Sequence, residues 1–286
     1  MGILDRMSLK GKSIYVTGGA QGLGKAMATG LAEAGADVAI VDINEDKAKA
    51  TAKEIADATG QKAIAIKTDV TDPDQVQHMV DTVVSELGGL DAAFNNAGMC
   101  LNIPAEDMSY EDWLKVVNLN LNSVFLCSQA AGRYMIKQGK GSIVNTASMS
   151  AHIVNRPQPQ CSYNATKNGV IQLSKSLAIE WAKKGVRVNT ISPGYMGTDL
   201  TLSSPDLKPL IKTWNDWAPL GRLGRPDELQ GMAVYLAGDT SSFSTGDDYL
   251  VDGALGGCKN PECPNTGLDP TKSPPQVKCP DLGIFS

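Results

Sequence analysis

Residues 13–24 read SIYVTGGAQGLG and combine three features in a row. Residues 13–16 carry the β-branched and aromatic side chains of a buried strand. Four glycines follow within the next eight residues, and a helical pattern runs from residue 24 to 34. A strand that enters a helix through a glycine-rich turn presents backbone N–H groups and the positive end of the helix dipole to an anion. This order therefore predicts a strand–turn–helix unit that holds a phosphate group.

The same order of strand and helix is repeated along most of the chain. Strands are expected at residues 13–16, 37–41, 62–68, 92–95, 142–146, 186–192 and 247–253. Helices are expected at residues 24–34, 45–58, 74–87, 112–137, 162–184 and 227–237. Apolar strands that alternate with helices form a parallel sheet covered on both faces. We therefore predict an α/β fold, a doubly wound Rossmann-type three-layer sandwich with a seven-stranded parallel sheet and a ligand beyond the strands' carboxyl ends.

Residues 1–253 are predicted to form a single domain, and residues 254–286 a C-terminal extension. Within the domain, residues 195–220 break the alternation over a length that predicts a lid above the site. The extension is rich in proline and glycine and has almost no periodicity, so we expect either a disordered tail or a strap around a neighbouring subunit. Its three cysteines, Cys258, Cys263 and Cys279, have no histidine nearby, so we expect free thiols, with a disulfide as the alternative and no metal site.

The composition argues against large charged partners. The 286 residues carry a net charge of −5 and a pI near 5.1, without a block of Lys or Arg, so we expect neither a nucleic-acid nor a membrane partner. No apolar run reaches the roughly 18 residues that span a bilayer, and the N-terminal residues lack the pattern of a signal peptide. We therefore expect a cytoplasmic protein that binds small molecules.

Asp42 ends the second expected strand, 20 positions beyond Gly22. An acidic side chain at this point accepts hydrogen bonds from the ribose hydroxyls of an adenosine and repels a 2′-phosphate. Gln21, Ile43 and Asn44 supply no positive charge beside it. The sequence therefore predicts NAD as the cofactor, with NADP disfavoured.

The ends of the first four strands should meet at one edge of the sheet and line the dinucleotide. The residues expected there are Gly18, Gln21, Gly22, Leu23, Gly24, Asp42, Ile43, Asp69, Val70, Asn96, Ala97 and Gly98.

Tyr163 and Lys167 are four positions apart at the start of an expected helix, so both side chains lie on one helix face. A nearby ammonium favours the phenolate and lowers the pKa of a tyrosine, which makes Tyr163 a candidate general acid and base. Ser148 ends the fifth strand and can supply a hydroxyl to the reacting oxygen. Asn120 can bond a backbone carbonyl or a water beneath Lys167.

These motifs, in this order, resemble the short-chain dehydrogenases/reductases over about residues 8–253. The matching segments are TGGAQGLG at 17–24, DV at 69–70, NNAG at 95–98, Asn120, Ser148, YNATK at 163–167 and PGYMGT at 193–198. The resemblance implies that Asn120, Ser148, Tyr163 and Lys167 form a catalytic tetrad, that Lys167 also holds the nicotinamide ribose, and that the segment with Pro193, Gly194, Met196 and Thr198 binds the carboxamide. It also implies carbonyl and alcohol chemistry rather than enoyl reduction, because the Tyr-to-Lys spacing is four, and a homotetramer built on helices 112–137 and 162–184.

The loop between Ser148 and Tyr163 is a little longer than the family pattern and is rich in polar residues. Ser150, His152, Asn155, Gln158 and Gln160 could bond several hydroxyls, and the run NRPQPQ resembles that of sugar-alcohol dehydrogenases and ketose reductases of this family. We therefore expect a polyol or ketose substrate.

Several apolar side chains of the expected lid leave a different substrate open. They are Leu200, Leu202, Leu207, Trp214 and Trp217, which could cover a hydrophobic alcohol. A 3-oxoacyl, hydroxysteroid or small-diol dehydrogenase is thus the alternative within the family, and a non-catalytic dinucleotide sensor is the alternative from another class.

Overall fold

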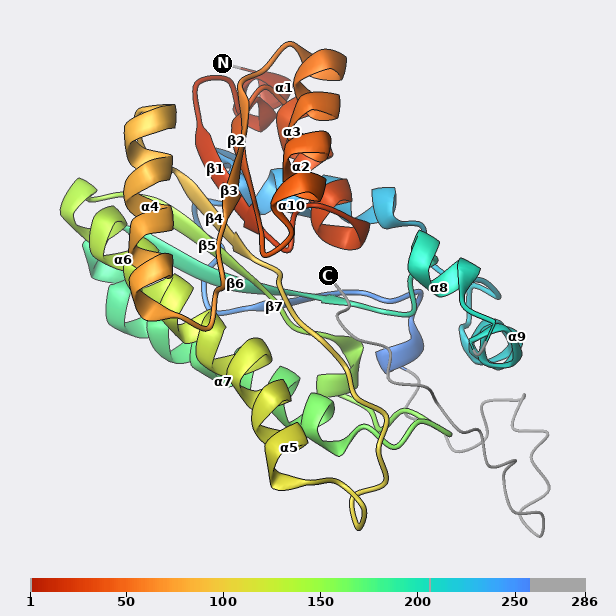
Figure 1. The fold of residues 1–286 in the computed structure, drawn as a ribbon. Coiled ribbons are helices and arrows are strands. Elements are labelled where there is room, and N and C mark those ends of the chain that lie inside the picture. The colour runs from red at the N-terminus through yellow and green to blue at the C-terminus, as the bar shows by residue number, and fades with distance from the viewer. Residues whose placement is uncertain (1, 206, 258–286) are drawn as a thin grey trace, which may run out of the picture.

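The computed structural model describes residues 2–205 and 207–257 and contains one seven-stranded sheet (Figure 1). All strands are parallel, in the order β3-β2-β1-β4-β5-β6-β7. The strands are β1 (Ser13–Thr17), β2 (Asp37–Asp42), β3 (Ala63–Lys67), β4 (Ala92–Asn95), β5 (Gly141–Thr146), β6 (Val186–Pro193) and β7 (Asp248–Val251). The predicted doubly wound sandwich is confirmed, and its strand order reverses between β1 and β4.

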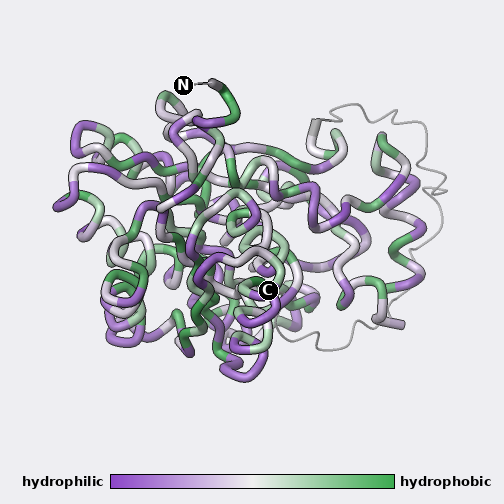
Figure 2. Tube along the Cα trace, turned by 90° about the horizontal axis from the view of Figure 1, so that it is seen from above, coloured by the Kyte–Doolittle hydropathy of each residue, from purple (hydrophilic) through white to green (hydrophobic). Residues whose placement is uncertain are grey.

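Helices cover both faces of the sheet (Figure 1). One face packs against α2 (Gly22–Glu33), α3 (Glu45–Thr59) and α10 (Gln230–Ala237). The other packs against α4 (Pro73–Leu87), α6 (Ser123–Gln138) and α7 (Cys161–Trp181). Each strand alternates between the two layers, so that Ile14 and Val16 face the first group of helices and Tyr15 faces the second. In Figure 2 hydrophobic and hydrophilic stretches alternate along the trace.

Local sequence signals set where these helices begin and end. The Asn44 side chain caps α3 by accepting from the Lys47 amide, and the Asp72 carboxylate caps α4. Gly60 and Gly88 end the same helices in the left-handed conformation, with φ of 72° and 81°. These signals explain why the helix boundaries lie close to those expected from the sequence.

The structure differs from the expectation in two helical regions. The single helix expected at residues 112–137 consists of α5 (Tyr110–Val117), a π-helical turn at Asn118–Asn122, and α6. The expected lid is not irregular, because it contains α8 (Asp199–Ser203) and α9 (Lys208–Trp217), whose buried Leu207, Leu210 and Trp214 form a small apolar cluster of their own. A short helix, α1 (Ile3–Met7), also precedes the sheet.

Within residues 2–205 and 207–257, no helix has the length and apolar character needed to cross a membrane. The expected extension is described only as far as a 3₁₀ turn at Leu255–Gly257. The rest of it, with Cys258, Cys263 and Cys279, lies outside the described residues.

Candidate active site

The glycine-rich turn after β1 has the geometry of a phosphate cradle. Gly18 and Gly22 have φ values of 61° and 57°, a region that favours glycine. A Cβ on Gly24 would lie 2.1 Å from the Gly18 carbonyl oxygen, so the backbone of the turn and the first turn of α2 are in direct contact. The side chain of Gln21 does not cap α2. Gly22 and Leu23, at the positive end of this helix, line the cavity described below, so this end fits the pyrophosphate of a dinucleotide.

The ends of β1 and β4 are held together beside this cradle. The Thr17 hydroxyl accepts from the amides of Asn96 (2.9 Å) and Ala97 (3.1 Å), and the Asn96 side chain donates to the Thr17 carbonyl at 3.1 Å. These bonds fix the NNAG turn at the point where the strand order reverses, which is where open α/β sheets bind their ligands.

Asp42 lies where the sequence placed it, at the end of β2, and its carboxylate is fixed. One oxygen accepts from the Ala20 amide at 3.2 Å and the other from the Asn44 amide at 2.9 Å. A cation that sequence reasoning missed lies near the same turn, because the Lys47 ammonium donates to the Gln21 side chain at 3.0 Å. Of the residues after Asp42, only Ile43 and Asn44 lie close enough in the sequence to suggest a charge effect on the ribose site. Lys47 is five residues away, but the first turn of α3 brings its side chain back to the glycine turn.

The third strand contributes less than expected to the cavity. One oxygen of the Asp69 carboxylate accepts from the amide and the hydroxyl of Thr71, at 2.9 and 2.7 Å. Four predicted residues lie outside the lining of the cavity that contains Tyr163 and Lys167, at the sheet edge next to it, namely Asp42, the exposed Ile43, Asp69 and Val70.

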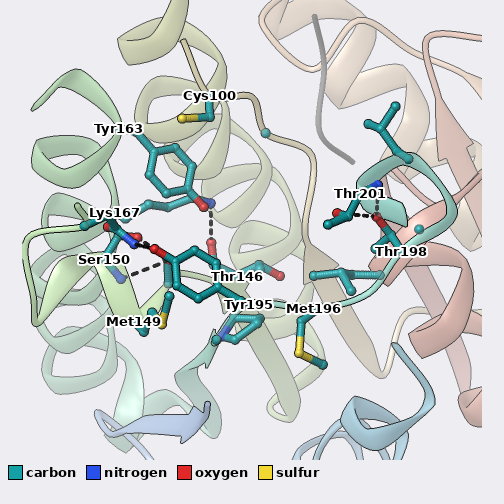
Figure 3. A pocket seen from close by; sticks show the side chains of 18 of the residues that line it. Cys100, Thr146, Met149, Ser150, Tyr163, Lys167, Tyr195, Met196, Thr198 and Thr201 are labelled. Atoms are coloured by element: carbon teal, nitrogen blue, oxygen red, sulfur yellow. Dashed lines mark hydrogen bonds between the residues drawn. The ribbon is translucent and has the colours of Figure 1, made fainter. Parts of the chain in front are cut away.

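Tyr163 and Lys167 lie on one face of α7, as predicted, and Ser148 and Thr146 face them from the end of β5. The Lys167 ammonium donates to the Thr146 carbonyl at 2.8 Å and lies 5.5 Å from the centre of the Tyr163 ring. The Ser148 side chain is buried, and its hydroxyl accepts from the Ser150 amide at 3.1 Å. Figure 3 shows Tyr163, Lys167 and Tyr195 on one side of the pocket and Thr198 and Thr201 on the opposite side.

The electrostatics differ from the sequence-based expectation that Lys167 lowers the pKa of Tyr163. Burial raises the pKa of Tyr163 above its ordinary value, the nearby Cys100 adds to this, and a hydrogen bond with Ser148 opposes it. Burial also lowers the pKa of Lys167 to about 8. The expectation was wrong, because desolvation by burial has the largest influence on the pKa of both groups.

Asn120 lies in the π-helical turn and is fully buried. Its side chain accepts from the Met99 amide and donates to the Met99 carbonyl, both at 2.8 Å, and donates to the Thr166 hydroxyl at 3.3 Å. The predicted bond to a backbone carbonyl is thus present. Asn120 links the NNAG turn to α7, and its carboxamide oxygen lies near Gly98, where an added Cβ would be 3.2 Å from it.

A cavity of about 280 Å³ joins the glycine turn to the Tyr163 region. The predicted residues that line it are Gln21, Gly22, Leu23, Asn96, Gly98, Ser148, Ser150, Asn155, Gln158, Gln160, Tyr163, Lys167, Pro193, Gly194, Met196 and Thr198. Further lining residues that were not predicted as site residues include Cys100, Asn102, Thr146, Tyr195 and Thr201. Cys100 and Asn102 could have been found, because they follow the NNAG turn directly at the same sheet edge.

The polar loop before α7 contributes to the cavity wall, with one exception. Asn155 and Gln160 are buried in it, and the Gln160 amide donates to Asn155 (2.9 Å), Asn164 (3.0 Å) and Ser150 (3.4 Å). His152 was predicted as a substrate contact, but the structure does not bring it together with Asn155 and Gln160. It does not line the cavity, and its ring pairs at 2.6 Å with Asp248 of β7, whose side chain is 7% exposed.

The segment expected to form a lid, residues 195–220, contributes both apolar and polar groups to the cavity. Leu200, Leu207 and Trp214 line it, whereas Leu202 and Trp217 do not.

Among residues 2–205 and 207–257, no cluster of three or more His, Cys, Asp or Glu side chains is close enough to hold a metal ion.

Comparisons with known proteins find relatives that match most of this chain. A family model described as enoyl-(acyl carrier protein) reductase matches residues 18–255. The chain is 44% identical over 248 residues to a sorbose reductase of Schizosaccharomyces pombe, which covers 86% of this chain and 96% of that protein. It is 43% identical over 254 residues to an NADP-dependent mannitol dehydrogenase of Hypocrea jecorina, covering 88% and 94%. A crystal structure of a short-chain type dehydrogenase/reductase from Mycobacterium marinum superposes with a TM-score of 0.85 at 43% identity, covering 89% and 99%.

Proposed function

The chain belongs to the short-chain dehydrogenase/reductase family, and from this premise we propose that it interconverts a secondary alcohol of a polyol and the ketone of a ketose. The observation that carries the proposal is the placement of Ser148, Tyr163 and Lys167 in one cavity with the buried carboxamides of Asn155 and Gln160. A reactive phenol beside several polar groups suits a substrate that carries many hydroxyls. The relatives named sorbose reductase and mannitol dehydrogenase support the same substrate class.

In this proposal each side chain has one role. A bound nicotinamide dinucleotide would supply the hydride acceptor for oxidation of the alcohol and the hydride donor for reduction of the ketone. During oxidation the phenolate of Tyr163 takes the proton of the substrate hydroxyl, and the Ser148 hydroxyl donates to the same oxygen. Lys167 provides a positive charge near the ring, and Asn120 holds the Met99 backbone and Thr166 in place beneath it.

The cradle at Gly18 to Gly24 fits the pyrophosphate, and we propose NAD as the preferred dinucleotide. The Asp42 carboxylate supports NAD, because two backbone amides fix it at the end of β2, where a 2′-phosphate would be repelled. Two observations favour NADP instead. The Lys47 ammonium lies beside Gln21, and several relatives are named NADP-dependent. We expect Asp42 to dominate, since Lys47 is exposed and its charge is screened by water.

The test of this function is NADH formation with a panel of sugar alcohols, small diols and hydroxysteroids. We expect turnover of sugar alcohols and a loss of about 100- to 10,000-fold in kcat for Tyr163→Phe, which keeps the ring and removes the acid–base group. Activity confined to the apolar alcohols would replace the polyol proposal with the hydroxysteroid alternative. A Tyr163→Phe variant as active as the parent would favour a dinucleotide sensor. The homotetramer and the cytoplasmic location stay predictions.

A further inference from the structure

Three segments that are distant in the sequence meet at one oxygen atom in the wall of the cavity. The carboxamide oxygen of Gln158 accepts from the Tyr195 hydroxyl at 3.1 Å and from the Trp214 indole nitrogen at 3.2 Å. Gln158 belongs to the loop before α7, Tyr195 follows β6, and Trp214 lies on the lid helix α9. We call these three residues the latch.

The latch is well packed. The rings of Tyr195 and Trp214 stack with their centres 4.3 Å apart and an angle of 12° between their planes. Trp214 is only 4% exposed, and it belongs to the apolar cluster of the lid. A buried indole N–H requires an acceptor, and Gln158 supplies it.

The donor and acceptor of each hydrogen bond in the latch are fixed, because an indole nitrogen can only donate. Gln158 must therefore present its oxygen to Trp214, and the Tyr195 hydroxyl must donate to that oxygen as well. The same hydroxyl is then left to accept from the Asn155 amide, which lies 2.8 Å away. Asn155 in turn presents its oxygen to the Gln160 amide nitrogen at 2.9 Å.

This sequence of donors and acceptors ends at the substrate side of the cavity. With its nitrogen occupied by Asn155 and its neighbours, Gln160 directs its carboxamide oxygen toward Cys100, whose sulfur lies 3.6 Å away. A thiol is a weak donor, so this oxygen keeps the capacity to accept from a stronger one such as a substrate hydroxyl. Figure 3 shows Cys100 beside the Tyr163 ring, on the same side of the pocket as Tyr195.

We propose that Gln158 is a positioning residue that fastens the lid to the loop before α7 and thereby orients the Gln160 oxygen toward a substrate hydroxyl. Gln158 acts through Tyr195 and Asn155 and need not touch the substrate itself. Breaking the latch loosens the lid and releases Gln160 to turn. The affinity for a hydroxylated substrate then falls, while the groups that perform the chemistry stay in place. The inference rests on the proposed function only for the choice of a sugar alcohol as substrate.

The test compares three changes at the latch with one control. Gln158→Leu removes the acceptor, Gln158→Glu keeps an acceptor for both donors, and Trp214→Phe keeps the stacking but removes one donor. Gln77→Leu, on the exposed outer face of α4, makes the same chemical change away from the site. For Gln158→Leu we expect KM for the sugar alcohol to rise about tenfold, with kcat within threefold of the parent, in keeping with the loss of two hydrogen bonds. Gln158→Glu should restore most of the affinity, and Gln77→Leu should match the parent.

A second measurement needs no turnover, namely hydrogen–deuterium exchange of the α9 amides in the full-length protein. We expect faster exchange in α9 for Gln158→Leu and parent-like exchange for Gln158→Glu and Gln77→Leu. The double variant Gln158→Leu/Trp214→Phe should resemble Gln158→Leu alone, because both changes break the same bond. Unchanged α9 exchange in Gln158→Leu, or fully additive effects in the double variant, would overturn the latch. If no polyol is a substrate, the exchange measurement still tests the latch, so the two proposals fail separately.

Discussion

The ammonium of Lys167 donates a 2.8 Å hydrogen bond to the carbonyl oxygen of Thr146, the last residue of β5. Lys167 is only 3% exposed, and burial lowers its pKa from 10.5 to about 8. The protein thus holds a charge in a place that disfavours it, which destabilises the fold at neutral pH. Groups that destabilise the fold in this way are common at functional sites.

Lys167→Met should therefore inactivate the enzyme and stabilise the fold at pH 7. Above pH 10.5 Lys167 is neutral in both the folded and the unfolded protein, so its burial carries no penalty for a charge. As pH falls from 10.5 through about 8, the unfolded chain takes up the proton first, so that about 3 kcal/mol is lost. The variant avoids this loss but gives up the Thr146 bond, about 1 kcal/mol. Urea unfolding should show a gain of about 1 to 2 kcal/mol at pH 7 that disappears near pH 10.5, and a less stable variant at pH 7 would contradict this.

The raised pKa of Tyr163 predicts that oxidation depends on pH near neutrality and that reduction does not. Oxidation needs the phenolate, so its kcat/KM should rise with pH through the alkaline range, whereas reduction uses the neutral phenol and should be flat near pH 7. Because the bond from Ser148 lowers this pKa, Ser148→Ala should move the rise in oxidation to higher pH. Steady-state pH profiles of both proteins check this. An unshifted profile in Ser148→Ala would show that the bond does not tune Tyr163.

Cofactor choice should depend on two side chains of opposite charge near the glycine turn. Asp42→Ala removes the fixed carboxylate, so we expect kcat/KM with NADP to rise at least tenfold relative to NAD. Lys47→Met removes the nearby ammonium and should lower the use of NADP by a few-fold. Initial rates with both dinucleotides measure the ratio. Equal use of NAD and NADP by the unmodified protein would refute the role assigned to Asp42.

Most of the fold could be predicted because its signals are local. The β-branched runs, the helix caps at Asn44 and Asp72 and the glycines after helices fix the strand and helix boundaries before any tertiary contact is considered. The π-helical turn at Asn120 was not predicted, since it moves the later apolar positions by a single residue and carries no sequence signal of its own. The lid helices were missed because α8 has five residues and α9 buries its apolar face in a small separate cluster.

In the site too, features with a local sequence signal could be predicted and features that depend on tertiary structure could not. Tyr163, Lys167 and Ser148 could be placed by motif and topology, since parallel strands end at one sheet edge. The position of His152 could not, because its partner Asp248 lies 96 residues away on β7. The sign of the Tyr163 pKa shift was also out of reach, since it depends on how deeply the ring is buried. Long-range pairing and burial are properties of the folded chain that a sequence pattern does not encode.

The contact between Gly24 and Gly18 predicts a localised effect on dinucleotide binding. A methyl group on residue 24 would lie 2.1 Å from the Gly18 carbonyl oxygen, so Gly24→Ala must displace the turn. We expect the Kd for NADH to rise at least tenfold, measured by the fluorescence of the bound dinucleotide. Gly231→Ala is the matched control, because this exposed residue of α10 has open space around it and the change should stabilise the helix by about 0.5 to 1 kcal/mol. A Gly24→Ala variant that binds NADH normally would show that the turn does not hold the pyrophosphate.

The pair formed by His152 and Asp248 predicts an effect on the whole loop before α7 rather than on one substrate. The Asp248 side chain is only 7% exposed and also accepts from the hydroxyl of Ser192 at 2.7 Å, so it anchors the first part of this loop on β7. His152→Gln loosens that anchor without touching the cavity. We expect KM to rise for all sugar alcohols by a similar factor of about 2 to 10, as the loss of one charge-assisted hydrogen bond suggests. The ratios of kcat/KM among the substrates should stay as in the parent, and a change in those ratios would return His152 to the role of a direct substrate contact.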